Sequence, residues 1–255
     1  MIVTDSGDDE GIINLLASDN LEVINDACLW IRDYFLCCDQ NQIGEAIGND
    51  KFKSLIIPEL EKLVFADNHF IRKQVIYTLA KISSYESISI LLEAFEQFRD
   101  EDPILLPQLV GELFWLGVDN FGDLMARMIT SKEYTTRWAV IATLPTFMYN
   151  HPDDTDENFV MRVSCSEQLR HDANKFVQAE AEYEYQCLLL RRSQEEENLS
   201  KSEYKQRRQQ IKSLKPALSF AQVEVEFSNY LYSHNLVNCT IAELERFINT
   251  YIMVN

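Results

Sequence analysis

The sequence predicts an all-α protein built from stacked pairs of helices. Only 7 glycines and 6 prolines occur in 255 residues, whereas average usage would give about 18 and 13. So few turn residues favour long helices joined by short loops, and we expect at least about 60% helix and no β-sheet. Apolar residues also recur at helical spacing in several similar segments, which indicates a repeat protein.

The clearest repeat spans residues 55–82. An apolar helix comes first, with Pro58 in an early turn, where proline is tolerated. A short turn at residues 66–68 separates it from a second helix, whose apolar residues recur every three or four positions. The stripe that we expect this second helix to bury is Ile71, Val75, Thr78, Leu79 and Ile82.

Residues 55–82 resemble a HEAT repeat. The resemblance rests on the proline in the first helix, Asp67 in the turn, the Ile71–Arg72 pair that opens the second helix, and the small Ala80 late in it. It implies a right-handed α-solenoid, in which first helices line the convex surface and second helices line the concave surface. One repeat cannot bury its own apolar face, so neighbouring repeats must stack.

Weaker copies of the pattern lie at residues 12–35, 88–116 and 119–147. The aligned second-helix positions are about 32 to 48 residues apart, which fits an irregular array with a loop insertion near 39–50. Two of the four positions lack the family's arginine, so an Asp–Arg ladder between repeats would be broken at the N-terminal end. Pro107 falls inside the second helix of the third copy. In order, the aligned positions are Ile24, Arg72, Leu105 and Arg137.

The polar segment 150–158 divides the chain into a repeat array, residues 1–149, and a C-terminal helical region, residues 150–255. Helical patterns resume after this break, and two capping boxes mark the starts of later helices. These boxes are Ser200 with Glu203 and Thr240 with Glu243. The pattern leaves open whether the C-terminal region holds degenerate repeats or forms a helical cap.

The net charge of −18 is unevenly distributed along the chain. Residues 1–50 hold eleven acids and one base, Arg32, whereas residues 191–215 hold eight bases and four acids. An acidic field repels nucleic acid and anionic membranes and attracts cationic partners, although a merely solvated surface would need no partner. We expect the basic stretch 201–215 to contact the protein's own acidic surface.

No catalytic motif accompanies the repeats. The sequence lacks glycine-rich nucleotide-binding loops, the zinc-protease helix motif and the serine nucleophile elbow. The four histidines show no metal-ligand spacing, and the six scattered cysteines are typical of buried small hydrophobic residues. Neither a signal peptide nor a transmembrane run is visible. We therefore expect a cytoplasmic protein that is not an enzyme, with no cofactor and no metal.

These observations predict a non-catalytic binding or scaffold protein that uses the concave face of an acidic repeat array. We expect its partner to be another protein with a basic surface, and neither DNA nor a membrane. The alternatives are an immunity protein that neutralises a basic toxin, and a HEAT-like lyase or DNA glycosylase relative. Residues 1–150 hold twenty-four acids against eleven bases, which argues against DNA binding.

Helical spacing predicts which side chains line the concave face. In the first repeat, the expected buried stripe is Leu21, Ile24, Cys28, Ile31 and Phe35. Positions off this stripe, and their equivalents in later repeats, are the candidate partner-binding residues, because large aromatic residues flanked by charge are typical interface anchors. The three tryptophans Trp30, Trp115 and Trp138 are either such anchors or fill gaps between repeats. The candidates are Glu22, Asp26, Trp30, Asp33, Lys73, Tyr77, Glu112, Trp115 and Arg137.

Overall fold

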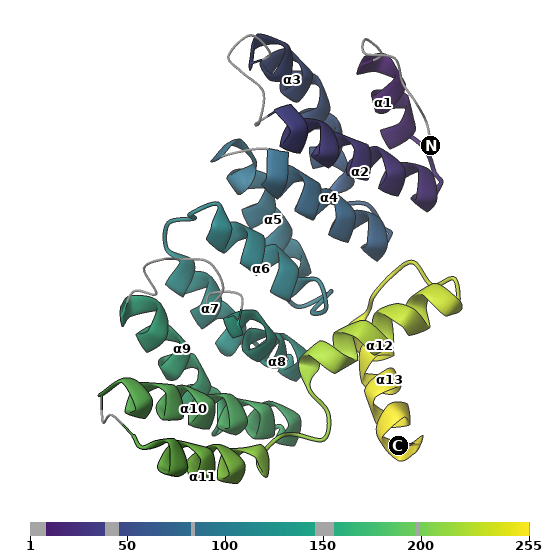
Figure 1. Cartoon of the computed structure of the whole chain (residues 1–255). Helices are drawn as coiled ribbons and strands as arrows, with labels where there is room; N and C mark the ends of the chain where they lie inside the picture. Colours follow the sequence, from purple (N-terminus) through teal and green to yellow (C-terminus); the bar gives the residue numbers. More distant parts are fainter. Residues whose placement is uncertain (1–8, 39–45, 83–84, 146–155, 197–198, 255) are drawn as a thin grey trace.

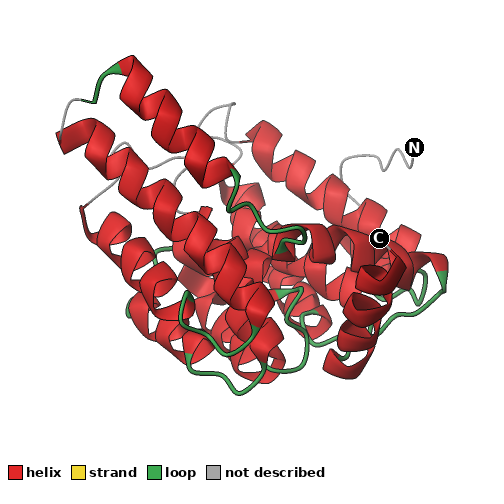
Figure 2. Cartoon of the chain, turned by 90° about the horizontal axis from the view of Figure 1, so that it is seen from below, coloured by secondary structure: helices red, strands yellow, loops and turns green. Residues whose placement is uncertain are grey.

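The computed structural model describes residues 9–38, 46–82, 85–145, 156–196 and 199–254. Within these ranges the chain forms thirteen α-helices, short 3-10 segments and no strand (Figure 1; Figure 2). Helix accounts for 78% of the structure. The predicted all-α class and the predicted helix content are therefore confirmed.

The first ten helices form five successive pairs. The first helices of these pairs are α1 (Asp9–Leu16), α3 (Ala46–Leu63), α5 (Ile88–Phe98), α7 (Phe121–Ile129) and α9 (Asp156–Leu169). The second helices are α2 (Leu21–Cys38), α4 (His69–Ile82), α6 (Leu106–Trp115), α8 (Tyr134–Thr143) and α10 (Lys175–Glu196). Each second helix packs against its own first helix and against the second helix of the next pair (Figure 1). The second helices therefore form one continuous layer, whose free side we call the second-helix face.

Three further helices follow the fifth pair. α11 (Lys201–Lys212) packs against α10, at the opposite end of the layer from α2 (Figure 1). Because the pairs stack in one direction, the basic stretch 201–215 lies far from the acidic N-terminal helices, and α11 packs on α10 instead. α12 (Phe220–Ser233) packs against α8, and α13 (Ile241–Val254) packs against α12.

The buried residues follow the predicted stripes. In α2, four of the five predicted residues are buried and Leu21 is half-buried, and in α4 all five are buried. The buried apolar side chains form one cluster that extends from Ile12 in α1 to Ile248 in α13. Successive pairs thus share a single core, as expected when no pair can bury its apolar face alone.

Arg72, near the start of α4, ties the turn before α4 to the turn of the next pair. Its Nη1 donates hydrogen bonds to the backbone carbonyl oxygens of Ala66 and Asp67, at 2.7 and 2.9 Å. Its Nη2 donates to Asp102 Oδ2 at 2.6 Å, and both side chains are buried. A single side chain therefore satisfies the carbonyl oxygens of one turn and fixes the position of the next.

Arg137 repeats this arrangement at the start of α8. Its Nη1 donates to the carbonyl oxygens of Ser131 and Lys132, at 2.8 and 2.9 Å. Its Nε and Nη2 donate to the two carboxylate oxygens of Asp172, at 2.5 and 3.0 Å. We call these two arginine–aspartate contacts the turn ladder. The first pair makes no such contact, because the equivalent position holds Ile24, which is buried in the core.

Asparagine starts three of the five second helices. The side-chain oxygens of Asn20, Asn68 and Asn174 each accept a hydrogen bond from the backbone N–H two residues later, at 2.8 to 2.9 Å. Each bond satisfies an N–H that has no intrahelical partner at a helix start. The two predicted capping residues also act as predicted, since Ser200 and Thr240 accept from the N–H three residues later.

Pro107 lies inside α6, as predicted, in its first turn, where its missing N–H leaves no bond unmade. Two details of the sequence-based prediction are wrong. Pro58 lies deep inside α3 and not in an early turn, because α3 begins well before it at Ala46. Residues 46–50, expected in a loop insertion, are helical.

The remainder of that insertion, residues 39–45, and the expected boundary between residues 149 and 150 lie outside the described residues. Beyond this boundary, α9 packs against α7 and α8, and α10 packs against α8. This is the pattern in which the preceding pairs are stacked.

Replacing Leu79 by Asp should severely destabilise the protein. Leu79 is fully buried in α4, and the substitution places a carboxylate between stacked helices. We expect the free energy of unfolding to fall by at least about 4 kcal/mol, measured by urea denaturation followed by circular dichroism. Leu29→Asp is the matched control, because Leu29 is 44% exposed and should cost less than about 0.5 kcal/mol. Near-wild-type stability of the Leu79 variant would contradict the packing of α4.

Candidate binding surface

α12 lies across the second-helix face. It starts where Phe220 packs against α8. Further along, Glu224 forms an ion pair of 2.7 Å with Lys73 of α4. After α12, the carbonyl oxygen of Val237 accepts a hydrogen bond of 2.7 Å from the backbone N–H of His69. α12 and the segment after it therefore bridge the first half of α8 and the first half of α4.

The buried carboxylate of Glu180, in α10, fixes the start of α12. Its Oε2 accepts hydrogen bonds from the indole N–H of Trp138 in α8, at 2.5 Å, and from the backbone N–H of Phe220 in α12, at 2.7 Å. One carboxylate thus joins three helices. Burial raises the pKa of Glu180 to about 7, against the lowering effect of the two hydrogen bonds, and the nearby charge of Glu184 adds to the rise.

α2 keeps an open free side at the N-terminal end of the layer. Glu22, Asp26, Leu29 and Asp33 are exposed and recur every three or four residues, so they form one line opposite the buried stripe of α2. We call this line the acidic stripe. In the part of the chain that the structure describes, none of its three carboxylates forms an ion pair. Leu29 places an apolar side chain between them.

Arg32 does not neutralise the acidic stripe, because its side chain turns toward α4. It is 8% exposed. Its Nη1 donates to Thr78 Oγ1 at 2.8 Å and to Gln74 Oε1 at 3.3 Å, and its guanidinium lies 4.9 Å from the centre of the Tyr77 ring. The single base of residues 1–50 is therefore used to join two helices, and the stripe keeps its negative charge.

Trp30, the predicted aromatic anchor on α2, is a packing residue. It is half-buried, stacks on Tyr34 with 5.3 Å between ring centroids, and meets the edge of Phe52 at 5.8 Å. Phe52 belongs to α3, so Trp30 packs α2 against the neighbouring first helix. The structure therefore favours the gap-filling interpretation at this position.

Three predicted residues lie on the second-helix face but contact the chain itself. Lys73 is held by α12, as described above. Tyr77 is 38% exposed, and the Lys81 ammonium lies 5.1 Å from its ring centre. Glu112 is buried, with Lys81 Nζ at 3.6 Å from its carboxylate; burial raises its pKa, and Lys81 acts against this rise. None of the three extends the acidic stripe of α2.

The remaining predicted residues also separate into different environments. Trp138 is fully buried and stacks on Phe176 at 5.3 Å, whereas Trp115 is 41% exposed at the end of α6. Arg137 belongs to the turn ladder and is committed to Asp172. The nine candidates therefore do not form one surface. Only the three carboxylates of α2 lie together and remain open.

Sequence reasoning missed the residues that hold the layers and α12 in place. Asp102 and Asp172 accept the ladder arginines, and Glu180 accepts from α8 and α12. One local signal existed: Glu180, Glu182 and Glu184 alternate with alanine and tyrosine in a helix. All three carboxylates accept from donors on other segments. These contacts join residues that lie 30 or more positions apart, and the spacing of residues in the sequence does not predict such contacts.

Across the described ranges, no group of three or more His, Cys, Asp or Glu side chains is arranged to hold a metal ion. Cys28, Cys165, Cys187 and Cys239 are free. Burial raises the pKa of each of these thiols, to about 11 for Cys165, so they are neutral near pH 7. The side chains of Cys37 and Cys38 lie outside the described part.

No described helix combines the length and the apolar character needed to cross a membrane. Comparisons with protein-family models, with curated proteins and with solved structures find no match. The candidate surface is therefore interpreted from its own geometry and charge.

The stability of the protein should fall as pH rises through the titration of Glu180. The pKa of this carboxyl is about 7 in the folded chain, against an ordinary value of 4.5. Between these values the folded state binds more protons than the unfolded state, so the free energy of unfolding decreases as pH rises. Glu180→Gln stays neutral and keeps an acceptor oxygen. Near pH 8 this variant should be more stable than wild type, by up to about 3 kcal/mol.

The measurement is urea unfolding of wild type and variant at several pH values across that range. Glu226→Gln is the matched control, because Glu226 is exposed on α12, and its unfolding should follow wild type at every pH. Parallel pH profiles for wild type and Glu180→Gln would show that Glu180 is charged in the folded state throughout.

Proposed function

We propose that this chain is a non-catalytic protein-binding protein, a HEAT-like right-handed α-solenoid that docks the basic surface of another protein on the acidic stripe of α2. The observation that carries the proposal is the stripe itself. Its carboxylates are exposed and make no ion pair in the described chain, whereas Lys73 and Lys81 of the neighbouring α4 are paired within the protein. Exposed charge of one sign speeds encounter with an oppositely charged partner.

The solenoid part of the proposal is supported by how the pairs stack. Second helices pack in one layer, the two ladder arginines occupy the same place in the second and fourth pairs, and α9 with α10 continues the pattern. This favours a fifth, degenerate repeat over a separate cap for residues 156–196. α12 and the segment after it occupy the first halves of α4 and α8, whereas α2 at the N-terminal end of the layer keeps an open side.

The test uses two charge-reversed baits. Wild-type chain, Asp26→Lys/Asp33→Lys, and the control Glu93→Lys/Asp123→Lys are each used for affinity capture from the native host, followed by mass spectrometry. The control reverses two charges that are exposed on the first helices α5 and α7. A protein held by wild type and control but lost from the α2 variant supports the proposal. A basic toxin is one such partner, so the same test covers the immunity-protein alternative.

Association with the captured partner should depend steeply on salt and on the α2 charges. We expect Asp26→Lys/Asp33→Lys to slow association by about tenfold or more, while its unfolding free energy stays within about 0.5 kcal/mol of wild type. Surface-binding kinetics at about 0.01 M and about 0.15 M salt should differ, because the Debye length falls from about 30 Å to about 8 Å. An unchanged association rate would mean that the stripe is only a solvated helix face.

Leu29→Ala should act on dissociation instead. Leu29 is the exposed apolar side chain between the carboxylates, and a contact that is desolvated after encounter mainly sets the lifetime of a complex. We expect dissociation to become about five to ten times faster, since a hot-spot truncation costs at least about 1 kcal/mol. Leu55→Ala, at a position 38% exposed on α3, is the control and should leave both rates unchanged.

A further inference from the structure

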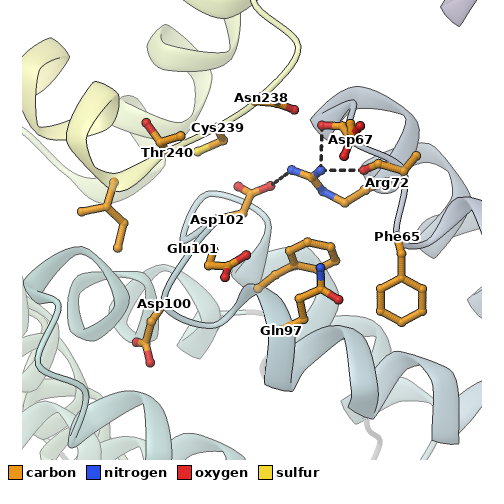
Figure 3. Close-up of a pocket in the computed structure, with 13 residues that line it drawn as sticks. Phe65, Asp67, Arg72, Gln97, Asp100, Glu101, Asp102, Asn238, Cys239 and Thr240 are labelled. Carbon is orange, nitrogen blue, oxygen red and sulfur yellow. Dashed lines mark hydrogen bonds and ion pairs between the residues drawn. The ribbon is translucent and has the colours of Figure 1, made fainter.

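An open cavity of about 410 Å³ lies where three distant segments meet. These segments are the turn before α4 (65–67), the end of α5 with its following turn (97–102), and the segment that enters α13 (238–241) (Figure 3). The cavity lies on the edge formed by the turns of the second and third pairs, away from the acidic stripe. Its volume is within the range of about 300–1,000 Å³ of small-ligand sites.

Carboxylates dominate the wall of this cavity. Asp67, Asp100, Glu101 and Asp102 line it, against a single base, Arg72. The Arg72 guanidinium is already held by two carbonyl oxygens and by Asp102, and it covers the Phe98 ring at 4.6 Å. Asp67 and Glu101 are exposed at the opening and form no ion pair among the described residues.

Asp102 supplies a buried carboxylate oxygen that receives no N–H or O–H donor. It is 1% exposed, and its Oδ2 receives Arg72 and contacts His69 Nδ1 at 2.7 Å. The oxygen without such a donor is Oδ1. A buried oxygen without a hydrogen bond lowers the stability of the folded protein. A ligand that donates an N–H group would supply the missing hydrogen bond. The Cys239 thiol hydrogen-bonds to Asp102 but is only a weak donor; burial, the Asp102 charge and this hydrogen bond raise the pKa of the thiol.

The remaining wall is apolar or neutral. Phe65, Phe98 and Ile241 supply apolar surface, and Gln97, Asn238 and Thr240 supply neutral polar groups. The start of α13 favours no anion here, because Thr240 caps it and the Glu243 carboxylate lies at the same turn. The wall is therefore suited to a group that donates hydrogen bonds, carries positive charge and has an alkyl stem.

We propose that this cavity binds an ammonium or guanidinium group on an alkyl stem, with Asp102 Oδ1 accepting from it at the base and Asp67 and Glu101 facing its charge at the opening. The cavity is much larger than a metal ion, and its four carboxylates are spread around the wall, so an organic cation fits it better. The group belongs either to a free small cation, such as a polyamine, or to a lysine or arginine side chain of a protein. The site is separate from the acidic stripe and does not depend on the function proposed for it.

The test is a titration of the full chain, followed by NMR of its backbone amides. The probes are spermidine, a short blocked peptide with one central lysine, and the same peptide with that lysine acetylated. We expect at least one cationic probe to bind and to shift the amide signals of Glu101, Asp102 and Thr240, and the acetylated peptide not to bind. Binding of spermidine alone identifies a free cation, and binding of the lysine peptide identifies a protein side chain.

Asp67→Asn/Glu101→Gln removes two charges at the opening without touching the turn ladder. It should weaken binding of the cationic probe by about tenfold, since it removes both exposed charges that face the cation. The control Glu93→Gln/Asp123→Asn removes two exposed charges elsewhere and should bind like wild type, as should Asp26→Lys/Asp33→Lys. Failure of every cationic probe to bind wild type, or equal binding by the cavity variant, would overturn the proposal. Either result would leave the proposal for the acidic stripe unaffected, because that proposal is tested separately by the association and dissociation rates of the α2 variants.

Discussion

The turn ladder is the constraint on which the stacking of the helix pairs depends. In the turns after α3 and α7, backbone carbonyl oxygens lie outside any helix and need other donors. Arg72 and Arg137 donate to such oxygens in their own turn and then reach an aspartate in the next pair, at 2.6 and 2.5 Å. The same guanidinium therefore satisfies one turn and sets the register of the next. A buried ion pair adds little net stability over apolar packing, so we interpret the ladder as a device that specifies how the pairs are aligned.

α12 depends on a different kind of contact. Its place on the second-helix face is set by Glu180 at its start, by the ion pair between Glu224 and Lys73, and by a backbone hydrogen bond after its end. The face that would be the natural binding groove of a repeat array is thereby partly occupied by the chain itself. This moves the open, charged surface to α2 at one end, and it creates the cavity at the edge, since the segment 238–241 closes one side of that cavity.

Much of the fold could be predicted from the sequence, because it depends on local patterns. The spacing of Ile24, Cys28 and Ile31 gives the buried side of α2, and the Asp-Asn turns give the helix starts. The open acids of the candidate surface follow from the same spacing. What could not be predicted is where side chains find partners far along the chain. Trp30 and Trp115 have similar local sequence settings, yet one packs between helices and the other is exposed. Glu180 and Asp102 show no local sign of the donors that reach them.

The distribution of bases explains why the surface is more acidic than the composition alone implies. The chain holds 23 Lys and Arg residues against 41 Asp and Glu residues, but several arginines of the helix pairs turn inward. Arg32 joins α2 to α4, and Arg72 and Arg137 hold the turn ladder. These bases offset carbonyl dipoles and buried aspartates rather than surface carboxylates. The acids left outside, on α2 and at the cavity opening, therefore face solvent without the counter-charge that lies next to them in sequence, and this makes both places suited to cationic groups.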